Sequence, residues 1–165
     1  TCVPLKILVS TQTGRRYLCL YHPELRRFSN ARLDSIQKVV SGEPYEAYSK
    51  VLSDLEQNQG KCWGVSFGNG RNRLQEVCIK LRIDEEKEPY ILNRLYREGR
   101  GGQVMKIREN EYLYSGMFFD TNEMLSWVKT FTGRIMDIQG TNLFSIAKIT
   151  RDWEKMYEMY CGNEE

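Results

Sequence analysis

Long apolar runs, paired cysteines and histidines are scarce in this 165-residue sequence. No stretch approaches the roughly 20 apolar residues needed to span a bilayer, so we expect no membrane partner. The five cysteines are widely spaced and form no C-x-x-C pair, which is atypical of a disulfide framework or a zinc site. We therefore expect reduced, structural cysteines in a cytoplasmic protein that binds no metal.

The first residues also lack the charged and apolar regions of a signal peptide. The chain starts without a methionine and reaches a strand-like run almost at once. We interpret it as a fragment and expect further residues before Thr1 in the complete protein.

Catalytic constellations are missing as well. Because His22 is the single histidine, the sequence has no Cys–His or Ser–His–Asp arrangement that would activate a nucleophile. Segments 68–70 and 99–102 are rich in glycine, but neither joins an apolar strand to a helix through Gly-Lys-Ser/Thr, so neither is a phosphate loop. The remaining candidates are carboxylates scattered over turns and helix starts. We expect a protein that is not an enzyme and carries no cofactor.

What the sequence does contain is an uneven distribution of charge. Its net charge is only +2, but residues 1–42 hold seven Lys or Arg against two acidic residues, a balance of +5. The rest of the chain carries −3. This basic third favours an anionic partner, although a solvated surface with uneven charge would give the same count.

Three strand-like runs open the chain. The first is apolar and β-branched, a Thr13-Gly14 turn follows it, and Pro23 ends the second because proline cannot continue a ladder. Short strands joined by tight turns favour a small barrel over a doubly wound sheet. A helix with Pro44 at its first position and an apolar face comes next. The expected strands are 6–10, 16–21 and 32–40, and the expected helix runs from 44 to an end at 57–60.

The polar, glycine-rich segment 68–73 marks the expected domain boundary. Beyond it the apolar patterns give the order strand, helix, strand, strand, helix, strand, which is the ferredoxin-like plan. The second helix begins with Asp120-x-x-Glu123, which resembles a capping box in which Glu123 reaches back to the N-cap. The expected elements are strand 76–83, a helix from Pro89, strands 103–108 and 111–119, a helix over 120–133 and strand 134–138.

A final helix is expected from about residue 141 to residue 160. Its apolar residues step by three and four and form a narrow seam close to the 3.5-residue period. We favour packing of this seam on the domain's own sheet, with subunit contact as the alternative. The seam consists of Leu143, Ile146, Ile149, Trp153, Met156 and Tyr160.

Several motifs occur in the order and spacing of a known family. Two of them resemble the strand motifs of the WYL domain found in bacterial transcription regulators: Gly14-Arg15-Arg16-Tyr17-Leu18 and Arg32-Leu33-Asp34-Ser35-Ile36. Arg16 stands in place of the family's tryptophan, and Ser35 in place of its second arginine. Segment 120–128 with Phe131-x-Gly133 resembles the C-terminal extension of these regulators.

The resemblance implies an α+β fold in two parts. A small Sm-like (SH3-like) β-barrel, partial because the family's opening strands before Val3 are absent, precedes a ferredoxin-like βαββαβ module with a terminal helix. The boundaries are 1–60 for the WYL domain and its connecting helix, 61–73 for a linker and 74–165 for the extension. In the family these parts follow a winged helix-turn-helix head that binds promoter DNA as a dimer.

The resemblance also implies a basic groove that takes a nucleotide or single-stranded nucleic acid. An arginine beside tyrosines offers bidentate donors to a phosphate and a ring for base stacking, so the chemistry agrees. Arg32 is the foremost candidate ligand contact. The full candidate set is Arg32, Tyr17, Arg16, His22 and Arg27.

Each candidate also has a structural interpretation. We expect Asp34 to pair with Arg32 or cap a turn rather than bind a ligand. Tyr17 can equally pack in the core, His22 is typical of a turn, and Arg27 can be a solvated turn residue.

Two functions follow from these observations. We expect the ligand-sensing and dimerisation region of a WYL-family transcription regulator, which forms a homodimer and reaches promoter DNA through a head that this chain lacks. The alternative is a nucleic-acid-binding accessory protein of a phage-defence system, in which the single strand itself is the partner.

Overall fold

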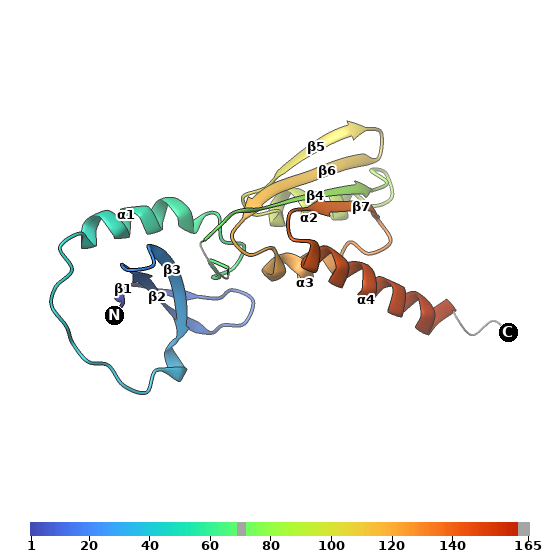
Figure 1. Ribbon diagram of the computed structural model, residues 1–165. Helices are drawn as coiled ribbons and strands as arrows, with labels where there is room; N and C mark the ends of the chain where they lie inside the picture. The colour runs from blue at the N-terminus through green and yellow to red at the C-terminus, as the bar shows by residue number, and fades with distance from the viewer. Residues whose placement is uncertain (69–71, 162–165) are drawn as a thin grey trace.

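The computed structural model describes residues 1–68 and 72–161. Over these residues it shows a mixed α+β protein with two antiparallel sheets, of three and four strands, and four α-helices (Figure 1). The three-stranded sheet and the first helix form one end of the molecule, and the four-stranded sheet with the other helices forms the other end. The expected boundary at 68–73 includes residues 69–71, which lie outside the described residues.

The first sheet is a meander with the order β1-β2-β3. Gly14 lies in the turn between the first two strands and has a φ of 67°, a conformation that glycine adopts at no steric cost. Because side chains alternate along a strand, Cys19 faces the interior while Leu18 and Leu20 lie on the opposite face. The strands are β1 (Val3–Val9), β2 (Arg16–His22) and β3 (Arg27–Arg32).

The third strand is not where the sequence pattern placed it, over 32–40. β3 covers Arg27–Arg32 and pairs with β2 along its whole length. Pro23 opens a tight turn whose last residue, Arg26, has a φ of 49°, so the chain returns to the sheet earlier than expected. A 3-10 turn at Leu33–Ser35 ends the strand. The three strands form an open sheet, and the described residues contain no closed barrel.

The helix after this sheet, α1 (Tyr48–Gln59), begins four residues later than the expected start at Pro44. The residues before it form an isolated turn, in which the Tyr48 amide donates to the Tyr45 carbonyl. Leu55 on α1 is fully buried against the inner face of the first sheet. Together these elements form the first core cluster, whose buried members are Leu8, Cys19, Leu55, Cys62, Val65, Phe67 and Phe119.

Two cysteines in this cluster behave as structural residues. Burial raises the pKa of Cys19 to about 11 and that of Cys62 to about 12. Both thiols are therefore neutral near pH 7 and are poor nucleophiles.

Residues 61–67, the connecting segment, join the two halves as a buried segment and not as a solvated linker. Cys62, Val65 and Phe67 belong to the first core cluster. Trp63 instead packs with the second core cluster, against Phe118 and Trp127 of the other half. The segment therefore contributes side chains to both cores.

The second half follows the order β4-α2-β5-β6-α3-β7. Its strands form one antiparallel sheet in the order β5-β6-β4-β7, with the helices on one face (Figure 1). Val77, Ile79 and Leu81 alternate toward those helices and are buried in the second core cluster. The elements are β4 (Gln75–Arg82), α2 (Pro89–Glu98), β5 (Gln103–Arg108), β6 (Glu111–Phe118), α3 (Leu125–Lys129) and β7 (Ile135–Gly140).

The expected capping box before α3 is half wrong. The Asp120 carboxylate does cap, accepting from the Asn122 amide at 3.1 Å. Glu123 does not reach back to Asp120. Its carboxylate accepts from three consecutive amides of the connecting segment, those of Gly64, Val65 and Ser66, at 3.0, 3.1 and 3.0 Å. Hydrogen bonds from three amides in another part of the chain stabilise the carboxylate more than the single N-cap amide that a capping box offers.

Gly64 leaves room for this contact between Glu123 and the connecting segment. A Cβ at Gly64 would lie 2.7 Å from the Glu123 carboxylate oxygen, too close for two unbonded atoms. The Asp120 carboxylate also accepts from the Ser66 hydroxyl at 2.7 Å. We call this group of contacts the Glu123 clasp; it fastens the start of α3 to the connecting segment.

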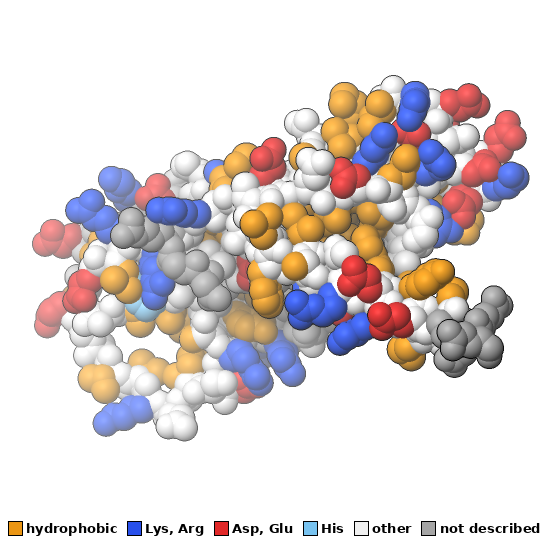
Figure 2. Space-filling view, turned by 45° about the vertical axis from the view of Figure 1, so that its right-hand side comes forward, with side chains coloured by type: hydrophobic (Ala, Val, Ile, Leu, Met, Phe, Trp, Pro, Cys, Tyr) orange, Lys and Arg blue, Asp and Glu red, His pale blue; other side chains and the backbone are white. Residues whose placement is uncertain are grey.

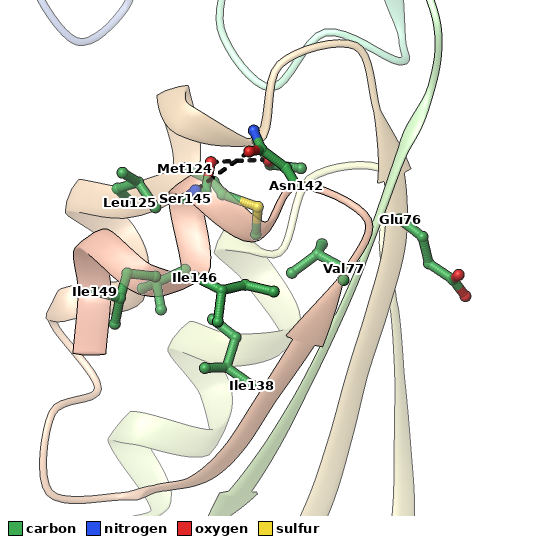
Figure 3. Close-up of a pocket in the computed structure, with 12 residues that line it drawn as sticks. Glu76, Val77, Met124, Leu125, Ile138, Asn142, Ser145, Ile146 and Ile149 are labelled. Atoms are coloured by element: carbon green, nitrogen blue, oxygen red, sulfur yellow. Dashed lines mark hydrogen bonds between the residues drawn. The ribbon is translucent and has the colours of Figure 1, made fainter. Parts of the chain in front are cut away.

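The terminal helix, α4 (Leu143–Cys161), packs on its own module through its first three turns, where Ser145 and Ile149 are buried. Ile149 is 1% exposed, and the Trp153 indole N–H donates to the Thr132 hydroxyl at 3.0 Å. At the start of the helix, Ile146 and Ile149 close over Met124 and Ile138 around a space of about 10 Å³, room for about one water at most (Figure 3). Of the apolar seam expected along this helix, Ile149 at the centre is buried, whereas Leu143 and Tyr160 at the two ends are exposed.

Candidate ligand-binding site

The structure brings Tyr17 and Arg32 together as direct cross-strand partners of β2 and β3. Residues so paired share one face of the sheet, with Cβ atoms about 4.5–5.5 Å apart. Tyr17 is half-buried against the first core cluster, so its ring is held in place, while Arg32 is exposed at the end of its strand. An aromatic ring and a guanidinium therefore lie side by side at the edge of this face.

Asp34 fixes the orientation of the Arg32 guanidinium. Its carboxylate accepts from Arg32 Nε at 3.0 Å and from Nη2 at 2.6 Å, a bidentate pair. These hydrogen bonds lower the pKa of Asp34, with a smaller contribution from the Arg15 charge, and raise that of Arg32. The expectation that Asp34 pairs with Arg32 is confirmed. The Nη1 edge of the guanidinium points away from this pair and has no hydrogen bond within the described residues.

The other three candidates lie elsewhere. Arg16, His22 and Arg27 are on the opposite face of the sheet from Tyr17 and Arg32. His22 pairs with Arg27 at the far end of the ladder, and its Nε2 lies 2.7 Å from the Ser29 hydroxyl. Five residues separate the two ends, roughly 17 Å at about 3.4 Å per residue. A small ligand bound at Arg32 therefore does not contact His22 or Arg27.

The sequence reasoning missed Arg15 as part of the site. Its charge acts on Asp34, so it lies near the Tyr17–Arg32 pair. The signal was present in the sequence, because Arg15 and Arg16 adjoin the Gly14 turn and alternate between the two faces. We refer to Tyr17, Arg32, Asp34 and Arg15 as the Arg32 site.

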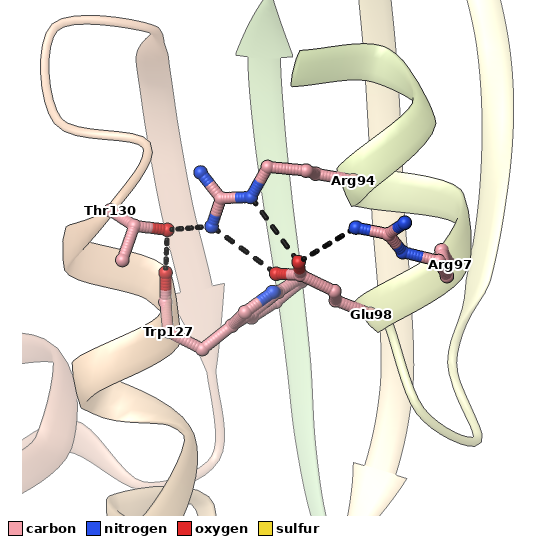
Figure 4. A network of polar contacts seen from close by, with 5 residues as sticks. All are labelled: Arg94, Arg97, Glu98, Trp127 and Thr130. Carbon is pink, nitrogen blue, oxygen red and sulfur yellow. Dashed lines mark hydrogen bonds and ion pairs between the residues drawn. The ribbon is translucent and has the colours of Figure 1, made fainter. Parts of the chain in front are cut away.

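Several arginines and lysines of the second module are engaged in internal ion pairs. On the visible face, the basic side chains form several separate groups and no single groove (Figure 2). Arg94 donates to Glu98 and, at 2.9 Å, to the Thr130 hydroxyl, which joins α2 to α3 (Figure 4). It also lies 5.3 Å above the Phe131 ring. Such arginines stabilise the second module and offer little to a ligand.

A second cationic group surrounds Glu111 on the helix-free face of the second sheet. The buried Glu111 carboxylate pairs with Lys80 at 3.0 Å, Arg108 at 2.9 Å and Arg82 at 3.4 Å. Hydrogen bonds from Arg108 and then Lys80 lower the pKa of Glu111 from 4.5 to about 2. These cations are held around one carboxylate and do not form a free anion site.

Glu111 makes the stability of this protein sensitive to acid. Because its pKa is lower in the folded state, its contribution is complete above pH 4.5 and is lost as the pH falls from 4.5 toward 2. We expect Glu111→Gln to lower the urea midpoint at pH 7 and to differ little from wild type near pH 2. Urea unfolding of both proteins across this range tests it. An equal gap at pH 7 and pH 2.5 would contradict the assignment.

Among the described residues, no group of three or more His, Cys, Asp or Glu side chains is placed to hold a metal ion. Within the same residues, no helix is both long enough and apolar enough to cross a bilayer. Comparisons with models of known protein families and with curated protein sequences give no match to this chain.

Proposed function

We propose that the first sheet binds an anionic, base-containing ligand at the Arg32 site, a nucleotide or single-stranded nucleic acid. The observation that carries the proposal is the cross-strand pair of Tyr17 and Arg32, with the guanidinium held by Asp34. The ring offers a stacking surface and the guanidinium a charge-assisted donor to phosphate. The +5 balance of residues 1–42 adds long-range attraction for an anion.

We further propose that the chain is the sensing and dimerisation region of a WYL-type bacterial transcription regulator. The strand order β5-β6-β4-β7, antiparallel throughout, supports a ferredoxin-like second module, and the meander β1-β2-β3 supports part of a small Sm-like barrel. Promoter DNA would be bound by a separate head, and a second copy of the chain is the expected partner, since most DNA-binding heads of this kind read two half-sites.

An accessory role in phage defence is the second candidate. It uses the same Arg32 site, with the single strand as the functional partner and no promoter. A winged helix-turn-helix head on the complete protein would support the regulator. A complete protein with another kind of head would support the accessory role.

Arg32→Ala tests the ligand site. We expect a fluorescent single-stranded oligonucleotide to bind about tenfold more weakly to this variant, because a phosphate loses a charge-assisted contact. Wild-type binding should weaken steeply with salt, since neutralised phosphates release counterions. Fluorescence anisotropy at several salt concentrations measures both effects.

Arg151→Ala is the matched control, because it removes an exposed arginine from α4, far from the first sheet. We expect it to bind as wild type does. Equal losses in the two variants would indicate non-specific attraction and would count against the Arg32 site. The same holds for binding that does not respond to salt.

A further inference from the structure

The last two turns of α4 carry an apolar surface that nothing in the described chain covers. Beyond Trp153 the helix leaves the body of its module (Figure 1). Met156, Tyr157, Met159 and Tyr160 are exposed there, and Tyr160 is 80% exposed. At 100° per residue these four side chains share about half of the helix circumference.

The first sheet carries a second uncovered apolar surface, on the face away from α1. Ile7 and Val9 on β1 are 57% and 58% exposed. On β2, Leu18 is the cross-strand partner of Ile7, and Leu20 lies two residues further along the same face; neither belongs to a core cluster. We call these four residues the outer sheet face. It lies opposite the Arg32 site, so both can be occupied at once.

The two surfaces are complementary in charge. The outer sheet face is bordered by Arg16, His22 and Arg27, and residues 1–42 carry +5. The exposed end of α4 has the opposite sign, because its residues 154–161 contain two glutamates and one lysine, a balance of −1. Opposite charges therefore favour contact between the helix end and the basic border of the outer sheet face, whereas two basic sheet faces would repel each other.

The two surfaces of one chain cannot meet. α4 is fastened to its module at Ile149 and Trp153, and its end lies at the opposite end of the molecule from the first sheet (Figure 1). We propose that a second copy supplies the partner: the end of α4 of each chain docks on the outer sheet face of the other, in a two-fold dimer. This deepens the dimer of the proposed function and does not depend on the ligand.

The available area is sufficient for a stable dimer. A buried aromatic side chain removes about 150–250 Å² from water, so Tyr157 and Tyr160 in two symmetric contacts contribute on the order of 600–1,000 Å². The methionines and the sheet side chains add to this. A standard interface buries roughly 1,200–2,000 Å² in total. Reciprocal exchange also closes the assembly at two chains and leaves neither surface free.

Mixing two variants provides the decisive test. Tyr157→Ser/Tyr160→Ser removes the helix surface, and Ile7→Glu/Val9→Glu removes the outer sheet face; all four residues are exposed, so both variants should fold. By sedimentation velocity we expect a wild-type dimer and about tenfold or greater weakening in each variant. An equimolar mixture of the variants should associate more strongly than either variant alone, because one of the two reciprocal contacts then joins an intact helix to an intact sheet face.

Other outcomes would overturn the proposal in distinguishable ways. A wild-type chain that stays monomeric at about 100 µM, far above a micromolar Kd, removes the dimer altogether. A wild-type-strength dimer in either variant, or a mixture that associates no better than either variant alone, shows that the chains associate through another surface. Met105→Glu is the matched control, since Met105 is 58% exposed on β5, and it should dimerise normally.

Discussion

Glu123→Ala is expected to destabilise the protein by about 3 kcal/mol, a large effect for one half-buried surface carboxylate. The substitution leaves the amides of Gly64, Val65 and Ser66 without their acceptor at 3.0–3.1 Å. Each buried donor left unpaired costs about 1–3 kcal/mol, and entering water recovers part of that. Urea unfolding followed by circular dichroism measures the loss.

Two further variants separate the Glu123 clasp from a general charge effect. Glu123→Gln keeps one carbonyl acceptor and should lose less stability than Glu123→Ala. Glu46→Ala removes an exposed carboxylate and should stay within about 0.5 kcal/mol of wild type. A Glu123→Ala protein within 1 kcal/mol of wild type would mean that the three amides are satisfied without the carboxylate.

Trp63→Ala should be equally damaging, at about 3–5 kcal/mol, because it leaves a large cavity in the second core cluster. The Trp63 side chain is 3% exposed and its ring lies 5.5 Å from Phe118 and 4.8 Å from Trp127. The loss should appear first in the second module, even though Trp63 lies between residues that belong to the other cluster. Hydrogen exchange should therefore show reduced protection in β4 and β6 before β2.

Phe67→Ala is the companion variant, since Phe67 is 2% exposed in the first core cluster. It should reduce protection in β2 first. If Trp63→Ala and Phe67→Ala reduce protection in the same strands, the connecting segment does not divide its side chains between two cores.

The second half of the fold was predictable because its patterns are strong and local. The alternation of Val77, Ile79 and Leu81 gave β4 to within one residue at each end. Pro89 marked the start of α2, and the segment Gln103–Arg108 was expected with its observed bounds. Each of these predictions depends on the alternation of apolar residues or on one residue at the end of an element. No contact with a distant part of the chain changes the outcome.

The first half shows where local patterns fail. Residues 32–40 were expected to form a strand, but Val39 and Val40 are about 80% exposed and the strand lies at Arg27–Arg32. The turn that moves it depends on a positive φ at Arg26, which arginine seldom adopts and no pattern signals. Glu123 was likewise assigned a local partner, because a sequence does not show that three amides some 58 residues away converge on it.

The candidate site was predictable only in part. The motif identified Tyr17 and Arg32, and the pairing of Arg32 with Asp34 was expected. The motif does not predict the pairing register of β2 and β3, and this register determines which residues face each other across the two strands. In the observed register Tyr17 and Arg32 share one face, whereas Arg16, His22 and Arg27 lie on the other.

Binding at the Arg32 site is the central claim, and chemical-shift mapping tests it most directly. A short single-stranded oligonucleotide is titrated at low salt into the ¹⁵N-labelled chain. The account predicts saturable shifts at Arg15, Tyr17 and Arg32, with residues of α4 and β5 unchanged and Arg32→Ala losing the response. Shifts centred on Lys80 and Arg82, or no saturable shift at any concentration, would contradict it.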